Sequence, residues 1–283
     1  MPRAFLLLTK PGIILGNALT AVAGFALGSY GTFRPLLFLA ELIGLSLIIA
    51  SACVSNNYID RKADQKMERT KNRALATGVI SPRQALLFAV FLGGSGTCVL
   101  FFFVNALSAL IALSGFLAYI GLYSFSKYKT VHGTLIGSLA GAVPPIVGYT
   151  AAGNRLDLTA LIFFTMLVFW QMPHFYAIAI YRLREYQAAS IPVLPAIKGI
   201  HAAKVQMILY CLAFIAISML LGVVHRFGMA YFGLTAVLGF GWLSLAIAGL
   251  HSKDDFVWAR TMFTVSLVVI LGLSIFITIA SLI

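Results

Sequence analysis

Long apolar runs constrain this chain most, because they recur from its first residues to its last. Crossing the hydrocarbon core of a bilayer takes about 17–25 helical residues, and nine runs reach that length. Only 10% of the residues are charged, whereas a soluble domain carries about 25%. We therefore expect an all-α membrane protein, a single transmembrane domain over residues 1–283 built as a bundle of nine helices. The runs cover about residues 12–30, 36–56, 84–104, 107–126, 132–152, 158–180, 204–224, 228–250 and 260–282.

The positive charges fall almost entirely on one side of these runs. Of the 20 Lys and Arg residues, 17 lie in the N-terminal segment and in the connections after the even-numbered runs, and only Arg34, Arg155 and Arg226 lie on the other side. Cytoplasmic loops are enriched in Lys and Arg, so we expect a cytoplasmic N-terminus and a periplasmic C-terminus. The first ten residues lack a cleavable signal and a transit peptide rich in Arg and Ser, which favours the bacterial cytoplasmic (inner) membrane. The same bias explains the net charge of +12 without a nucleic-acid partner.

One polar stretch interrupts the apolar pattern, from Asn56 to Arg73, and it carries nine charged residues. A charge at the centre of a bilayer costs about 2.5–3.5 kcal/mol, so this stretch lies at the membrane surface or lines a wet cavity. If the preceding helix continues, Asn56, Asn57, Asp60 and Asp64 share one face of it. Carboxylate and amide oxygens on one face suit a hard cation such as Mg²⁺. The competing interpretation is a solvated helix end with ordinary surface charges.

The basic residues that follow suit the anion that such a cation carries. Arg is well shaped for bidentate contact with phosphate, and Lys acts as a point charge. We therefore expect the basic side chains after Asp64 to bind a diphosphate. They are Lys66, Arg69, Lys71 and Arg73.

Two further connections on the same side hold candidate site residues. Glu185 is the only acid between Tyr181 and Pro195, and Arg182 and Arg184 flank it. This group is either part of the site or an interfacial anchor of its loop. Lys127, after the fourth run, is either a topology signal or a further diphosphate ligand.

Several residues within the apolar runs also stand out. Pro173 is expected to break the sixth helix and to expose carbonyl groups near His174, which is either a site residue or a hydrogen-bonded core histidine. Glu41, in the second run, is either functional, as intramembrane acids often are, or reaches the outer interface. Pro144 and Pro145 are expected to kink the fifth run.

Taken together, these motifs resemble the UbiA superfamily of intramembrane prenyltransferases. The superfamily motif N-D-x-x-D-x-x-x-D is matched from Asn56 to Asp64, except that Asn57 stands where most members have Asp. Asn at this position is usual in the haem-specific branch, which the chain resembles along nearly its whole length. A second aspartate-rich motif, typical of the quinone-type members, is absent, and only Glu185 stands as an acid there. The other matching segments are Thr9 to Ile14, Met67 to Arg73, Gly133 to Pro145, Trp170 to His174 and Ile191 to Pro195.

The resemblance implies a UbiA-like bundle around a chamber open to the cytoplasmic side. It implies transfer of the farnesyl group of farnesyl diphosphate to a vinyl group of haem B, with water addition, giving haem O and diphosphate. The implied cofactor is Mg²⁺, and the implied partners are the lipid bilayer and haem A synthase or terminal-oxidase assembly proteins. Asn57, Asp60 and Asp64 are the expected catalytic residues. The expected metal ligands are Asn56, Asn57, Asp60, Asp64 and Glu185; the diphosphate ligands are Lys66, Arg69, Lys71, Arg73, Lys127, Arg182 and Arg184; and His174 is the haem-binding candidate.

Two alternatives remain open from the sequence. One keeps the superfamily and changes the acceptor to another aromatic ring or tetrapyrrole, such as a quinone precursor. The other is a secondary transporter, since nine helices, Gly-rich runs and a Pro-Pro kink are compatible with one. Transporters, however, place their binding groups near the bilayer midplane, whereas the charges here gather at one rim.

Overall fold

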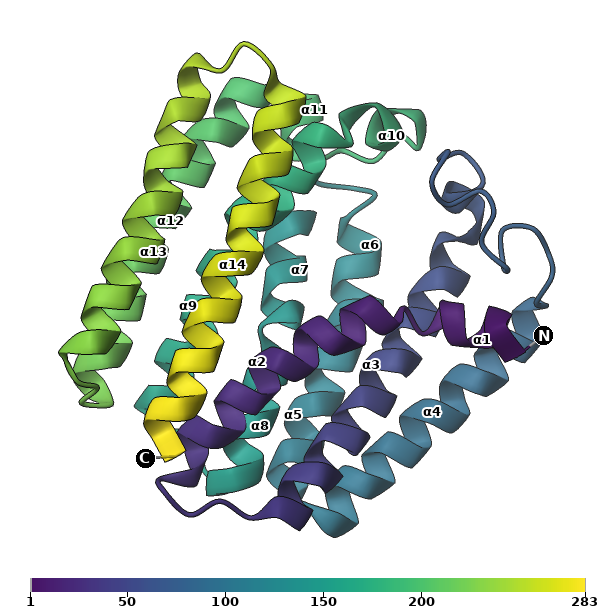
Figure 1. The fold of residues 1–283 in the computed structure, drawn as a ribbon. Helices are drawn as coiled ribbons and strands as arrows, with labels where there is room; N and C mark the ends of the chain where they lie inside the picture. The colour runs from purple at the N-terminus through teal and green to yellow at the C-terminus, as the bar shows by residue number, and fades with distance from the viewer. Residues whose placement is uncertain (1, 283) are drawn as a thin grey trace.

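The computed structural model describes residues 2–282, and over that range the chain consists of helices, turns and short connections (Figure 1). Nine helical segments within it are long and apolar enough to cross a membrane, which confirms the expected nine-helix membrane bundle. The elements are α1 (Pro2–Leu8), α2 (Pro11–Ser29), α3 (Pro35–Asp64), α4 (Pro82–Phe103), α5 (Ala106–Leu117), η1 (Ala118–Tyr123), α6 (Ser124–Ser126), α7 (Gly133–Gly141), α8 (Val143–Gly153), α9 (Leu158–Tyr181), α10 (Leu183–Ala188), α11 (Leu194–Ile197), α12 (Ile200–Val224), α13 (Met229–Ala248), η2 (Gly249–His251) and α14 (Asp255–Leu282).

The long connections define one polar end of the bundle. Residues 65–81, between α3 and α4, lie at the same end as α10 and α11, and the C-terminus lies at the opposite end (Figure 1). The helix α3 runs to Asp64 rather than stopping near residue 56. Its last two turns therefore carry polar side chains out of the apolar part of the bundle and toward the 65–81 connection.

Pro144 and Pro145 affect their helical span differently from Pro173. The span 133–153 is divided at Ala142 into α7 and α8, with Pro144 and Pro145 in the first turn of α8, as expected for a kink. Pro173 instead lies inside the continuous helix α9, so the expectation of a break at this residue is wrong. The helix packs against α12 on one side and α14 on another, and this packing holds it together where one backbone hydrogen bond is lost.

A π-helical segment interrupts the fourth span. The segment η1 separates α5 from α6, and it stacks the rings of Tyr119 and Tyr123 with centroids 5.3 Å apart. Single π-helical turns inside α-helices are frequent at functional sites. The sequence carries no obvious signal for this turn.

Glu41 is enclosed by the helices of the bundle. Its side chain is fully buried in α3, and neither carboxylate oxygen has a hydrogen-bond partner among the described residues. The helix α3 packs against α4, α5 and α8, so this acid lies among packed helices rather than on the exposed surface of the bundle.

The helices α2 and α8 pack with their backbones close together. A Cβ atom added at Gly24 would lie 1.9 Å from Pro145 O, and one at Gly148 would lie 2.2 Å from Ala21 O. Both contacts are with backbone atoms, which move only with their helices. Glycine is required at these positions because it lets the two backbones pack together.

Replacing Gly148 with alanine is expected to destabilise the bundle. Alanine favours a helix over glycine by about 1 kcal/mol, but overpacking costs about 1–3 kcal/mol, and here the obstacle is backbone. Gly148→Ala should therefore lower the thermal unfolding midpoint of the purified protein in detergent. The control is Gly241→Ala in α13, where no atom lies within 4 Å of the added Cβ. Equal midpoints for the two variants would contradict the close approach.

Candidate functional site

A large cavity of about 1110 Å³ lies within the bundle. Most of its wall is apolar, with Leu45, Phe116, Trp170 and Phe263 among the residues that line it. It reaches the polar end of the molecule, because residues of the 65–81 connection and of the segment before α11 also line it. The last turns of α3 supply its acidic residues.

Asp60 is held by two residues that follow α6. Lys127 Nζ lies 2.5 Å from both carboxylate oxygens, and Tyr128 Oη donates a hydrogen bond of 2.8 Å to Oδ1. Burial of Tyr128, followed by the neighbouring Asp60 charge, raises the pKa of the phenol. Tyr128 thus stays a proton donor, and Asp60 is 8% exposed at the cavity wall.

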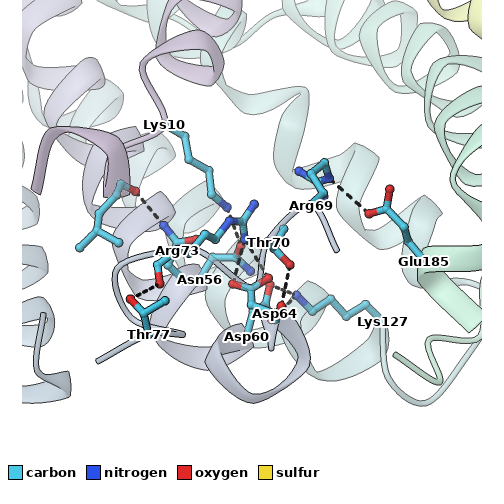
Figure 2. Close-up of polar contacts among 12 residues, drawn as sticks. Lys10, Asn56, Asp60, Asp64, Arg69, Thr70, Arg73, Thr77, Lys127 and Glu185 are labelled. Carbon is cyan, nitrogen blue, oxygen red and sulfur yellow. Dashed lines mark hydrogen bonds and ion pairs between the residues drawn. The ribbon is translucent and has the colours of Figure 1, made fainter. Parts of the chain in front are cut away.

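Asp64, one turn further along α3, is held by the connection that follows it. Arg73 NH1 lies 2.9 Å from each of its carboxylate oxygens, and Thr70 Oγ1 donates a hydrogen bond of 2.9 Å to its backbone carbonyl. Figure 2 shows the connection folded back over the end of the helix, so that these side chains converge with Asp60 and Lys127. The two acids and their two cations balance in charge.

The two asparagines point to different surroundings. Asn56 lines the cavity, and its Oδ1 accepts a hydrogen bond of 3.1 Å from Lys10 Nζ. Burial lowers the pKa of Lys10. Asn57 donates from Nδ2 to Leu8 O at 2.9 Å, so its amide lies against α1, and it is not among the residues that line the cavity. Its Oδ1 is buried and has no hydrogen-bond partner within residues 2–282.

Glu185 joins the two long connections at the polar end. Its carboxylate pairs at 3.0 Å with Arg182, which immediately precedes α10, and at 3.5 Å with Arg69 Nε (Figure 2). The distance to Arg69 is that of an ion pair rather than a hydrogen bond. Over the described residues, no three His, Cys, Asp or Glu side chains come together as a metal-binding group. Glu185 therefore does not join Asp60 and Asp64 in a three-acid group.

The basic residues expected to bind diphosphate are spread between cavity and surface. Arg69, Arg73 and Lys127 line the cavity. Lys71 pairs at 2.6 Å with Glu68, which is 82% exposed. Like Lys71, the other three do not line the cavity: Lys66 and Arg184 are exposed, and Arg182 is half-buried.

Several site residues were not singled out from the sequence. Lys10 was counted only among the positive charges of the N-terminal segment, and Tyr119 and Tyr123 were not named. All three line the cavity, and Lys127 Nζ lies 5.4 Å from the ring centroid of Tyr123. Lys10 contacts Asn56, 46 positions away, so only the folded chain reveals that contact. The one signal for Lys10 was the matching segment Thr9 to Ile14, which includes it.

His174 lies on a cavity wall formed by α9 and α14. It is 9% exposed, and its ring stacks on Trp170 with centroids 4.9 Å apart. The cavity thus has one end lined by acidic and basic side chains, and a wall of aromatic side chains that includes His174.

Comparison with known proteins gives one consistent family. Residues 17–268 match the model of the UbiA prenyltransferase family. The chain is 52% identical over 275 residues to a protein named protoheme IX farnesyltransferase from Protochlamydia amoebophila, which covers 97% of each chain. It is 48% identical over 280 residues to the protein of that name from Edwardsiella ictaluri, which covers 99% of this chain and 95% of the relative.

Solved structures share the fold at low sequence identity. A structure described for digeranylgeranylglyceryl phosphate synthase superposes with a TM-score of 0.81 at 16% identity and covers 99% of this chain and 98% of the other. A UbiA homologue from Archaeoglobus fulgidus, bound to DMAPP and Mg²⁺, gives a TM-score of 0.71 at 15% identity and covers 97% and 98%. At these identities the likeness concerns the arrangement of helices.

Proposed function

The chain belongs to the UbiA prenyltransferase family, and on that premise we propose that it transfers the farnesyl group of farnesyl diphosphate to a vinyl group of haem B. Water adds in the same reaction, and the products are haem O and diphosphate. The single observation that carries the proposal is the pair Asp60 and Asp64 at the polar end of an apolar cavity of about 1110 Å³. The whole chain acts as one transmembrane prenyltransferase domain.

The choice of substrates rests on the relatives. Proteins 52% and 48% identical over nearly the whole chain carry the name protoheme IX farnesyltransferase. A cavity with apolar and aromatic walls suits both a farnesyl chain and the flat face of a porphyrin. A quinone-type acceptor is less well supported, because these relatives are named for protoheme.

The donor set fits Mg²⁺ carried by a diphosphate. Mg²⁺ prefers oxygen ligands and is often held by one or two carboxylates together with phosphate oxygens. Asp60 and Asp64 supply the carboxylates and Asn56 adds an amide oxygen, and all three side chains line the cavity. When bound, the ion offsets the negative charge that develops on the departing diphosphate.

The basic residues that now balance the two acids bind the diphosphate. Lys127 and Arg73 turn from the carboxylates toward phosphate oxygens as the substrate arrives, and Lys10 and Arg69 lie on the same cavity wall. Glu185 acts through Arg69, which it holds at 3.5 Å. Charge-assisted bonds of this kind strengthen as negative charge builds up on the leaving group.

The chemistry follows from that charge distribution. The allylic C–O bond of farnesyl diphosphate breaks, and its electron pair leaves with the diphosphate. The vinyl group of haem B donates its π electrons to the allylic carbon, which leaves a cation beside the porphyrin ring. Water adds to this cation and loses a proton, which completes a hydroxyethylfarnesyl side chain. Tyr119, Tyr123 and Phe263 keep water from the allylic cation and offer it ring faces.

The orientation in the membrane follows the charge bias. We place the polar end and the N-terminus in the cytoplasm of a bacterium with an inner membrane, and the C-terminus in the periplasm. The reason is that 17 of the 20 Lys and Arg residues lie on the same side of the membrane as the N-terminus. Both the farnesyl donor and haem O partition into the bilayer. Direct transfer of haem O to haem A synthase or terminal-oxidase assembly proteins is the expected next step.

Product analysis tests the proposed reaction. Purified protein is incubated with haem B, farnesyl diphosphate and Mg²⁺, and the extracted pigment is examined by liquid chromatography and mass spectrometry. The expected pigment has the mass of haem B plus one farnesyl group and one water, and diphosphate release requires both substrates. Prenylation of a quinone precursor but not of haem B would replace the proposed acceptor. Uptake of a solute into vesicles without diphosphate release would indicate a transporter instead.

A further inference from the structure

The helices α9 and α14 meet at the cavity wall through one serine. His174 Nδ1 lies 2.7 Å from Ser266 Oγ, and Trp170 Nε1 donates a hydrogen bond of 2.8 Å to Ser266 O. Ser266 is fully buried, on the helix opposite both aromatic residues. It therefore contacts the histidine and the tryptophan that stacks on it, and so fixes the plane of the imidazole.

The single proton of the serine hydroxyl decides which imidazole tautomer is present. Ser266 Oγ lies 2.6 Å from Phe263 O, and a carbonyl oxygen can only accept a hydrogen bond. The hydroxyl proton is therefore committed to Phe263, and Ser266 Oγ accepts from the histidine. In neutral His174 the proton must then lie on Nδ1, which leaves the lone pair on Nε2.

The second ring nitrogen is not sealed inside the protein. Nε2 of His174 takes no hydrogen-bond partner within residues 2–282, and it is not among the fully buried polar atoms that lack one. His174 lines the cavity together with Trp170 and Phe263, and the Phe263 ring lies 4.8 Å from the imidazole. The lone pair on Nε2 is therefore accessible from a cavity with aromatic walls. Such walls suit the flat face of a porphyrin that carries iron.

We propose that Ser266 is a positioning residue, which fixes His174 as the Nδ1–H tautomer so that Nε2 ligates the iron of haem B in the cavity. The inference rests on the proposed function and extends it from the acceptor's identity to its mode of binding. Metal-ligating histidines donate their other N–H to a partner that fixes the ring and its tautomer. Without Ser266 Oγ, the ring is free to rotate and to place its proton on Nε2, the tautomer that cannot bind iron.

Porphyrin binding with and without iron separates positioning from simple packing. The purified full-length protein is titrated with ferric haem B and, separately, with metal-free protoporphyrin IX. The wild type should give the absorption and electron paramagnetic resonance spectra of histidine-ligated haem, and His174→Ala should lose them. Ser266→Ala should bind haem B about 10-fold to 100-fold more weakly and bind metal-free protoporphyrin IX as the wild type does. Ser266→Thr keeps a hydroxyl and should retain the histidine-ligated spectrum.

The matched control is Ser218→Ala in α12. Ser218 is also fully buried, and its hydroxyl also donates to a carbonyl of its own helix, Phe214 O at 2.6 Å. This variant should bind both porphyrins as the wild type does. For Ser266→Ala, two outcomes overturn the inference: unchanged haem affinity and spectrum, or an equal loss of haem B and metal-free protoporphyrin IX.

Product formation by the wild type distinguishes failure of the inference from failure of the proposed function. If the wild type makes haem O while Ser266→Ala keeps the wild-type haem spectrum, the positioning role is wrong and the proposed function stands. If the wild type shows histidine-ligated haem that depends on Ser266 but yields no farnesylated pigment, the positioning role stands and the proposed reaction fails. A wild type that binds no haem overturns both.

Discussion

Asp60→Asn and Asp64→Asn are each expected to lower the rate of haem O formation by about 10³-fold or more. Each replacement keeps the side-chain volume but removes one of the two carboxylate charges at the polar end of the cavity. Losing several kcal/mol of stabilisation of the departing diphosphate corresponds to a rate loss of this size. The measurement is the initial rate of farnesylated pigment with saturating substrates, repeated over a range of Mg²⁺ concentrations.

The control for both variants is Glu68→Gln. Glu68 lies in the connection that follows α3, and its side chain is 82% exposed. The variant Glu68→Gln therefore removes a nearby acid that does not line the cavity. Its rate should equal that of the wild type, and all three variants should elute as folded protein in size-exclusion chromatography. Near wild-type rates from Asp60→Asn and Asp64→Asn would show that these residues do not hold the metal. The proposed function would then lose the observation on which it rests.

Lys127→Met is expected to lower kcat by about 10²-fold to 10³-fold, the usual cost of losing one donor to a charge that develops in the transition state. Lys127 is nearly buried, with a side chain 11% exposed, and its ammonium group lies 2.5 Å from Asp60. In the proposed reaction it turns from Asp60 to the diphosphate, so its removal weakens the stabilisation of the leaving group. The measurement is kcat and KM for farnesyl diphosphate under steady-state conditions.

Lys129→Met controls for charge and position, since Lys129 is exposed and lies two residues away. It should leave kcat unchanged. The double variant Asp60→Asn/Lys127→Met should be scarcely slower than Asp60→Asn alone, because residues that act as a unit are not additive. Additive losses in the double variant would mean that the two side chains act independently, against the exchange of partners proposed here.

Part of the candidate site could be predicted because it lies within one helix. The spacing of Asn56, Asp60 and Asp64 indicates a common face, and α3 indeed continues to Asp64 and places all three on the cavity wall. Side chains four residues apart in an α-helix are neighbours whatever the rest of the fold does. Their role in binding a metal stays a prediction.

Other expectations failed or went unmade where the outcome depends on packing between helices. Pro173 was expected to break its helix, yet α9 continues through it. The sequence left Glu41 either as a functional acid or at the outer interface, and its full burial is visible only in the folded chain. The contacts of Lys10 with Asn56, and of Lys127 with Asp60, join residues 46 and 67 positions apart, and local periodicity says nothing about such pairs.

The number of spans, the polar end of the bundle and the acidic face of α3 all follow from the order of the residues. Hydrophobic length and the separation of charges are properties of the chain itself, and the bilayer enforces them on any fold. Which cation neutralises each acid, whether Glu185 joins Asp60 and Asp64, and which nitrogen of His174 carries the proton depend instead on the packed helices. Those outcomes are set by distances of a few ångströms between side chains from remote parts of the chain, and such distances exist only after folding.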